Sequence, residues 1–177
     1  SAFGISHKQF FEALEGYQPE PHRLQKVDDV NQVSFWNDSK STNLASVVAA
    51  CRSFSEKIIW IGGGKNKGQQ AGDFAKSLKP YLAGAYLIGE MSMPLNQSLQ
   101  ERGIKSTICK SLKEALHLAF EAAARRQKIL FSPGFSSFDM FSNYSVRGNS
   151  FKSLVFDLKR SSQEDTKLPV THLQISY

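Results

Sequence analysis

Short apolar segments alternate with segments of helical periodicity along most of this 177-residue chain. The apolar segments are KIIWIGG, GAYLIG, KSTIC and KILFSP, which begin at residues 57, 84, 105 and 128. A continuous apolar run is typical of a strand that is buried on both faces, and strands that alternate with helices predict βαβ units. We therefore predict an α/β domain with a Rossmann-like, doubly wound, mostly parallel sheet and helices on both faces.

The predicted helices lie between these strands and after the last one. They cover residues 44–54, 73–82, 93–103, 111–127 and 149–160. In the fourth helix, Arg125 and Arg126 would lie in the last turn, where cations offset the helix dipole. Residues 23–38 alternate around a polar turn at Asp28–Gln32, which predicts a short β-hairpin ahead of the first helix.

The N-terminal segment predicts a separate unit. Apolar residues recur at helical spacing between residues 6 and 17, and two prolines in the following QPEPH favour an extended linker. We expect residues 1–21 to be a helical remnant of a preceding domain with its linker. We expect 22–160 to form one domain, and the sequence assigns no role to a tail at 161–177.

The composition excludes several classes of function. No apolar run approaches the ~20 residues that a membrane helix needs, and no signal peptide is evident, so we expect a cytoplasmic protein without a membrane partner. The net charge is +6, but the cations are scattered and not interleaved with aromatics, so we expect no nucleic-acid partner. The spacing of histidines, cysteines and acids predicts no metal site and no covalent nucleophile.

Three polar loops follow predicted strands. They are NDSKSTN from residue 37, GGGKNKGQQ from residue 62 and SPGFSSFDMFSNYSVRG from residue 132. In a parallel sheet, ligands bind beyond the carboxyl ends of the strands, where such loops gather. These loops are therefore the candidate binding site.

The glycine-rich loop matches no standard phosphate cradle. Gly68 is followed by Gln69 instead of the lysine and hydroxyl of a P-loop, and Lys67 occupies the place of the third glycine in a dinucleotide fingerprint. Lys67 could meet a carboxylate or a phosphate as a point charge. The alternative is a mobile surface loop with solvated lysines, and the motif alone favours neither.

The other two loops also allow two interpretations. Most polar residues of NDSKSTN are good helix caps, but capping does not need Lys40, so hydroxyls, helix-start amides and this lysine could form an anion site. In the third loop, the phenylalanines are expected to pack. Ser136, Ser137, Asn143 and Tyr144 then remain to face a ligand, and Arg147 is expected to satisfy loop carbonyls.

These motifs, preceded by His22 and Arg23 and taken in this order, resemble the C-terminal domain of the Mur ligases, in particular the type that adds D-glutamate. The resemblance covers roughly residues 22–159. It implies an ATP-dependent ligase of peptidoglycan precursor synthesis. In that family, ATP phosphorylates the carboxylate of UDP-N-acetylmuramoyl-L-alanine, the amine of D-glutamate attacks the acyl phosphate, and phosphate leaves.

The resemblance also implies roles for individual residues. Those expected to contact D-glutamate are Thr42, Lys67, Ser137 and the backbone near Tyr144. Those expected near the adenosine or ribose of ATP are His22, Arg23 and Asp38. Lys40 is expected near the phosphates or the substrate carboxylate, so Lys40 and Lys67 would position substrates without taking part in covalent chemistry.

The resemblance covers only the last domain of such a ligase. No glycine-lysine-threonine loop and no magnesium carboxylates of the central domain are present. ATP and magnesium are therefore expected to serve the full enzyme, and this fragment, expected to be monomeric, is predicted to bind no cofactor and to be inactive alone. The alternatives are a free-standing nucleotide- or amino-acid-binding module, or another amide ligase of the Mur or folylpolyglutamate type.

Overall fold

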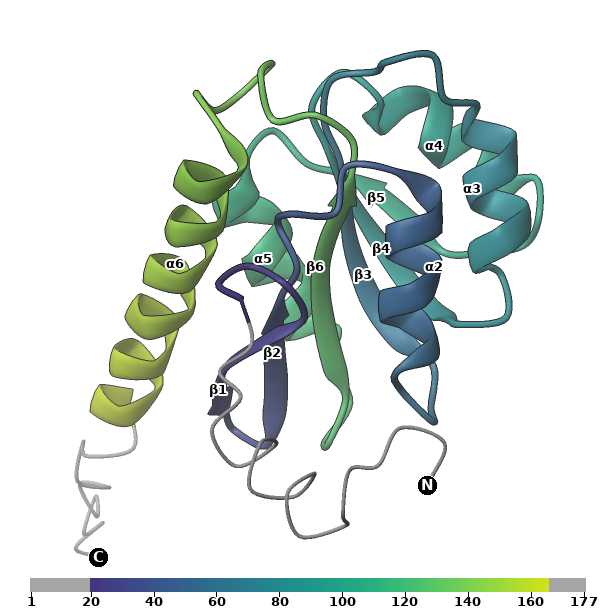
Figure 1. Cartoon of the computed structure of the whole chain (residues 1–177). Helices are drawn as coiled ribbons and strands as arrows, with labels where there is room; N and C mark the ends of the chain where they lie inside the picture. Colours follow the sequence, from purple (N-terminus) through teal and green to yellow (C-terminus); the bar gives the residue numbers. More distant parts are fainter. Residues whose placement is uncertain (1–19, 166–177) are drawn as a thin grey trace, which may run out of the picture.

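The computed structural model describes residues 20–165, so the helix expected between residues 6 and 17 and most of the expected tail lie outside the described residues. A six-stranded sheet forms the centre of the domain, with strands in the order β1-β2-β6-β3-β4-β5 (Figure 1). The strands are β1 (Gln25–Val30), β2 (Val33–Asn37), β3 (Ile58–Gly63), β4 (Leu82–Ile88), β5 (Ser106–Ile108) and β6 (Lys128–Gly134). The predicted α/β class is confirmed.

Parallel pairing joins all the strands except β1, which pairs antiparallel with β2. The predicted hairpin is therefore confirmed, and it extends the main sheet because β2 pairs with β6. Its turn is tighter than the predicted Asp28–Gln32, since only Asn31 and Gln32 lie between the strands. Both have positive φ, 47° and 67°, as the two-residue turns that match strand twist require.

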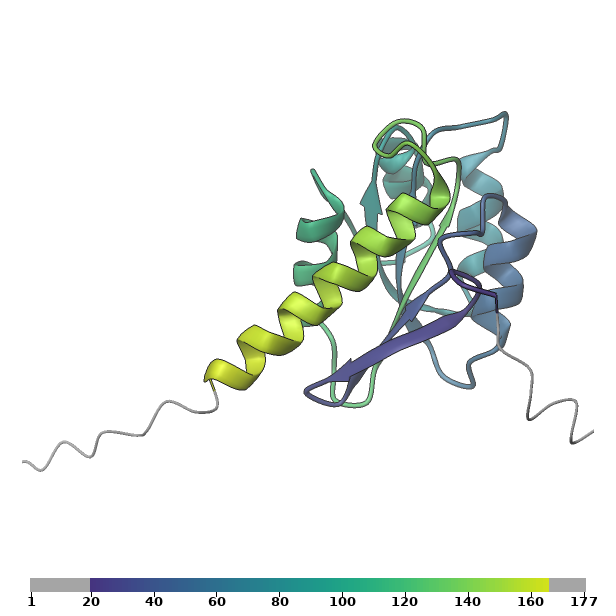
Figure 2. The same cartoon turned by 60° about the vertical axis from the view of Figure 1, so that its left-hand side comes forward.

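Helices cover both faces of the sheet. The first face carries α2 (Leu44–Arg52), α3 (Ala71–Leu78) and α4 (Ser92–Gln100), and the second carries α5 (Leu112–Glu121) and α6 (Tyr144–Asp165). Figure 2 shows α6 running along the face opposite α2 and α3. Each face has its own apolar core, centred on Trp60 and Phe74 on one side and on Phe131 and Phe151 on the other.

The first four predicted helices were too long at their C-terminal ends, the two that correspond to α5 and α3 by the most. The helix predicted at 111–127 ends at Glu121, and Arg125 and Arg126 lie beyond it, so neither offsets the dipole in its last turn. Arg126 adopts a left-handed conformation with φ 67°, and its amide bonds to Gln32 as the chain turns into β6. Helix α3 ends at Leu78 instead of residue 82 because Pro80 cannot continue it.

The last helix is longer than predicted at both ends. Helix α6 begins at Tyr144, five residues before the predicted start, and continues to Asp165, five residues past the predicted end. Gly148, which suggested a loop, lies inside the helix. A Cβ there would approach His22 Nδ1 to 2.3 Å, so the glycine makes room for the histidine ring and does not break the helix.

Candidate functional site

The three loops follow three neighbouring strands. The first loop (38–43) follows β2, the glycine loop (64–70) follows β3, and the serine loop (135–143) follows β6. Strand β6 lies between β2 and β3, and the three strands are parallel. The three loops therefore share the carboxyl edge of the sheet (Figure 1), which is the edge where ligands bind in such folds.

The side chain of Gln69 connects the glycine loop to the first loop, to the start of α2 and to the last residue of β6, directly before the serine loop. Its Oε1 accepts a hydrogen bond from the amide of Leu44 at 3.0 Å. Its Nε2 donates to the carbonyls of Thr42 at 3.3 Å and Gly134 at 3.0 Å. A primary amide can make these contacts at once because it carries two donors and an acceptor. This role was not predicted from the sequence, where the only indication was an amide side chain at the end of a glycine-rich loop.

The glycine loop and the serine loop also pair through their backbones. The amide of Lys65 donates to the Ser136 carbonyl at 2.8 Å, and the Ser136 amide donates to the Lys65 carbonyl at 3.1 Å. Gly64 makes this approach possible, because its φ is +136° and a Cβ would lie 2.4 Å from the Ser136 oxygen. Gly64 therefore serves the close packing of these two loops, whereas a Cβ at Gly63 would lie 2.1 Å from the Ile88 carbonyl oxygen in β4.

The residues expected to bind D-glutamate are carried by these joined loops. Lys67 is exposed, and its Nζ lies 5.7 Å from the ring centroid of Phe138, the neighbour of Ser137. Ser137 is buried, and its carbonyl accepts the amides of the following turn. Thr42 is exposed, and its carbonyl accepts from Gln69. The loops bring the three residues into one region of the carboxyl edge.

Tyr144 begins α6 at the same edge. Its ring meets His22 edge-on with centroids 6.3 Å apart, and Lys40 Nζ lies 5.8 Å from its centroid. The Tyr144 carbonyl accepts a hydrogen bond from Ser39 Oγ at 2.8 Å. Since a carbonyl oxygen accepts and cannot bind an anion, an anion near Tyr144 would meet backbone amides of the helix start, of which that of Val146 already donates to Asn143 Oδ1 at 2.8 Å.

Asp38 is buried, with both carboxylate oxygens bonded within the chain. Oδ1 accepts from the amide of Leu24 at 3.0 Å, and Oδ2 accepts from Ser132 Oγ at 2.7 Å and from Ser41 Oγ. Burial raises the pKa of Asp38 above its ordinary value, and the hydroxyl donors only partly offset this. Asp38 also lines a pocket of about 260 Å³ with Arg23 and the adjoining face of α2.

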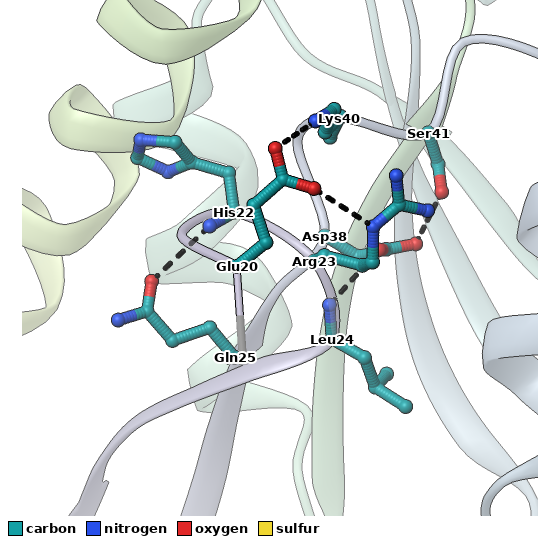
Figure 3. Close-up of polar contacts among 8 residues, drawn as sticks. All are labelled: Glu20, His22, Arg23, Leu24, Gln25, Asp38, Lys40 and Ser41. Carbon is teal, nitrogen blue, oxygen red and sulfur yellow. Dashed lines mark hydrogen bonds and ion pairs between the residues drawn. The ribbon is translucent and has the colours of Figure 1, made fainter. Parts of the chain in front are cut away.

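Glu20 pairs with both cations expected near the nucleotide (Figure 3). One carboxylate oxygen contacts Lys40 Nζ, and the other lies 3.4 Å from Arg23 Nε. The pairing lowers the pKa of Glu20, with the hydrogen bond from Lys40 as the largest cause. Sequence reasoning gave Glu20 no role.

His22 is buried at the entry of the chain into the domain. Its Nδ1 lies 3.0 Å from the Asn37 amide nitrogen, which also donates to the carbonyl of Gly148 in α6. Burial lowers the pKa of His22, and the charge of Lys152 lowers it further. In these contacts His22 joins the start of the domain to β2 and α6.

Arg147 confirms the predicted structural arginine. It is 1% exposed and donates to the carbonyls of Ser39 and Phe135 at 2.9 and 3.1 Å, and to Ser39 Oγ at 3.1 Å. Burial lowers the pKa of Arg147 to about 10. The guanidinium ties the first loop to the serine loop.

Asp139 fixes a fourth loop, which follows β4. Its Oδ2 accepts a hydrogen bond from the amide of Glu90 at 2.9 Å, and Gly89, with φ +71°, leaves no room for a Cβ beside this oxygen. No role for Asp139 was predicted from the sequence. The only indication there was that Asp139 is the one acidic residue between Ser132 and Gly148.

Residues 20–165 contain neither a membrane-spanning helix nor a cluster of metal ligands. No helix in this part of the chain is long and apolar enough to cross a bilayer. These residues also contain no group of three or more histidines, cysteines or acids that could hold a metal ion.

Comparison with known proteins agrees with this geometry. The family described as "Mur ligase, glutamate ligase domain" matches residues 22–135. The UDP-N-acetylmuramoylalanine–D-glutamate ligase of Geotalea uraniireducens is 39% identical over 155 residues, which are 88% of this chain and 34% of that protein. The chain thus spans about a third of the length of the curated relatives that it matches.

Solved structures share the fold at low sequence identity. The UDP-N-acetylmuramate–alanine ligase MurC of Thermotoga maritima has a TM-score of 0.62 at 13% identity, covering 89% of this chain and 35% of that one. A bifunctional folylpolyglutamate and dihydrofolate synthase of Yersinia pestis, complexed with AMPPNP and a manganese ion, has a TM-score of 0.59 at 14% identity. The match covers 85% of this chain and 35% of that one. With the family match over residues 22–135, the chain belongs to the Mur ligase family, whose glutamate ligase domain it contains.

Proposed function

We propose that this chain is the C-terminal domain of a ligase that joins D-glutamate to UDP-N-acetylmuramoyl-L-alanine at the expense of ATP. The observation that carries the proposal is the meeting of the three motif loops at one sheet edge. The relatives named as D-glutamate ligases, which align with 82–88% of the chain, support the choice of amino acid.

The chemistry needs this domain mainly to place the amino acid. After ATP has converted the UDP-linked carboxylate into an acyl phosphate, the neutral amine of D-glutamate attacks the acyl carbon, phosphate leaves with the bonding electron pair, and the new amide nitrogen gives up a proton to solvent. In our proposal, Lys67 pairs with a carboxylate of D-glutamate, and Thr42 and Ser137 donate hydrogen bonds to it. An amino acid held by its carboxylates keeps its amine free to attack, so the domain acts by positioning and charge stabilisation.

The nucleotide would approach the first loop. We propose that Arg23, with the pocket of about 260 Å³ that it shares with Asp38, lies near the adenosine or ribose. Since both oxygens of Asp38 are bonded within the chain, its role there is to hold the backbone of Leu24 and the hydroxyl of Ser41. Lys40 would reach phosphate once Glu20 releases it.

The rest of the enzyme lies outside this chain in the proposal. A UDP-binding domain and a central ATPase domain would supply the remaining contacts, including those to magnesium, which neutralises phosphate charge when bound. The nucleotide analogue and manganese of the Yersinia pestis synthase support a metal-nucleotide substrate. We further propose that the enzyme is cytoplasmic and monomeric, and that this chain alone is inactive.

The test joins this chain to the N-terminal and central domains of a D-glutamate ligase and measures phosphate release with different amino acids. We expect release with D-glutamate and little with L-alanine or L-glutamate. A preference for another amino acid would replace the proposal with a different amide ligase. Calorimetry on the chain alone tests the free-standing alternative, because tight binding of D-glutamate or ATP without the other domains would favour a binding module.

A further inference from the structure

A second group of cations lies at the amino edge of the sheet, far along the strands from the three loops. There a hollow of about 390 Å³ is lined by Lys57, Lys79, Arg102 and Lys105, and no acidic residue contributes to its lining. The remaining lining residues include Leu82 and the residues around it at the start of β4. The hollow therefore combines a concave shape with charge of one sign.

Most cations of this hollow lack an acidic partner. Some lysines elsewhere in the described residues meet acids, as in the pairs Lys26–Asp29, Lys128–Glu56 and Lys159–Asp28, so a charge is offset there. Within residues 20–165, Lys57, Lys79 and Lys105 have no acidic partner. Arg102 has one at 3.9 Å, the adjacent Glu101. The hollow consequently keeps most of its positive charge.

Helix dipoles account for only part of this charge. Lys79 follows α3 directly and Arg102 follows α4, so both offset the partial negative charge of a helix C-terminus. Each helix end is equivalent to only about half a charge. Lys57 and Lys105 line the same hollow from the segments that lead into β3 and β5, and neither belongs to a helix end. An excess of positive charge is left for an external anion.

A second hollow beside the first indicates which chemical group a bound anion would carry next to its charge. It measures about 250 Å³ and shares Ala83 and Lys105 with the basic hollow. Its lining includes Ile59, Tyr86 and Ala122, so it offers apolar and aromatic contact beside the cations. The two hollows together match a molecule that has a charged end and a flat, largely apolar end.

We propose that the amino edge binds a phosphorylated small molecule, with a di- or triphosphate on the four cations and its apolar part in the neighbouring hollow. Lysine ammonium groups bind phosphate as point charges and do not require a fixed geometry. None of the lining residues belongs to the three loops, so this site stands independently of the proposed ligase function.

The test titrates the full chain with ADP and with inorganic pyrophosphate while amide resonances are followed by NMR. We expect ADP to shift the Gly84 and Gly103 amides, and to bind more tightly than pyrophosphate because it also fills the apolar hollow. The triple variant Lys57→Gln, Lys79→Gln, Lys105→Gln should weaken this binding at least about tenfold. These side chains are at the surface, and an otherwise unchanged spectrum verifies the fold.

The matched control changes the opposite edge. Lys40→Gln with Lys67→Gln should leave the shifts at Gly84 and Gly103 as they are and reduce only shifts near Gly64. Absence of ADP-induced shifts at the amino edge, or shifts that the triple variant leaves unchanged, would overturn the proposal. Equal affinity for pyrophosphate and ADP would overturn the apolar part of it. If ADP shifts the amides at the amino edge but none near Gly64, the result counts against the ligase proposal and leaves this one standing.

Discussion

At the scale of single residues, Arg147 shows how the loops are held. Its buried guanidinium donates to two carbonyls and a hydroxyl of two different loops. Arg147→Met should lower the free energy of unfolding by about 2–4 kcal/mol, because the substitution leaves buried acceptors without donors. Urea denaturation measures the change, and Arg160→Met, at an exposed ion pair, should change it by less than about 1 kcal/mol. Equal effects of the two variants would refute this role.

His22 makes stability depend on pH. Its pKa lies below the 6.5 of an ordinary histidine, chiefly because it is buried. The unfolded chain therefore takes up this proton first as the pH falls, and stability is lost from about pH 6.5 downward through the folded pKa. The difference in unfolding free energy between about pH 7.5 and 5.5 should be smaller in His22→Gln than in the unchanged chain. Identical differences would contradict this assignment.

Glu20 competes with external anions for Lys40 and Arg23. Glu20→Gln should therefore tighten the binding of pyrophosphate near the first loop by a few-fold, and more at low salt than at high salt. The chemical shifts of the Lys40 and Ser41 amides report this binding. Glu56→Gln is the control, because Glu56 makes a comparable exposed pair with Lys128 elsewhere on the domain. Unchanged affinity in Glu20→Gln would show that the pairing does not compete.

At the scale of elements, the packing of the glycine loop against the serine loop can be tested with two glycines. Gly64→Ala should lower the free energy of unfolding by about 3 kcal/mol or more, since the new Cβ would lie 2.4 Å from the Ser136 carbonyl oxygen. Gly68 has φ +88° and open space where a Cβ would lie. Gly68→Ala should therefore lower the free energy of unfolding by only about 1 kcal/mol, the cost of backbone strain. Thermal or urea denaturation compares them. Similar costs would mean that the loops separate readily.

The sequence predicted the elements better than their ends. Buried strands and amphipathic helices follow from local periodicity, and the hairpin from alternation around a polar turn. The end of α5 could not be predicted, because the alanines after Glu121 favour helix and only the return of the chain into β6 stops it. The start of α6 was missed because Gly148 suggests a loop until the ring of His22 is seen against it.

The loops that form the site could be predicted from the sequence, but most of the contacts between them could not. Parallel strands place their loops at one edge, so the meeting of the three loops followed from fold class. Strand order did not follow, and it is the position of β6 between β2 and β3 that makes the loops neighbours. The contacts of Gln69 and Asp139 join residues far apart in the chain, so no local pattern could indicate them.

At the scale of the whole molecule, the two edges of the sheet carry different charge arrangements. The carboxyl edge holds Lys40 and Lys67 on joined loops, with Lys40 paired to Glu20, whereas the amino edge holds cations that mostly lack acidic partners. The chain aligns with only about a third of the length of the matched relatives, so the carboxyl edge has partner domains to face in our proposal. That arrangement makes the carboxyl edge the place where substrate discrimination should be sensitive to single substitutions.

The most direct measurement is the KM for D-glutamate of a ligase that contains this chain as its last domain, with Lys67→Ala. Loss of a charge-assisted pair costs about 1.5–3 kcal/mol, so this KM should rise at least about tenfold while the KM for ATP stays unchanged. Lys113→Ala, an exposed lysine on α5, should leave both values unchanged. An unchanged KM for D-glutamate in Lys67→Ala would contradict the account.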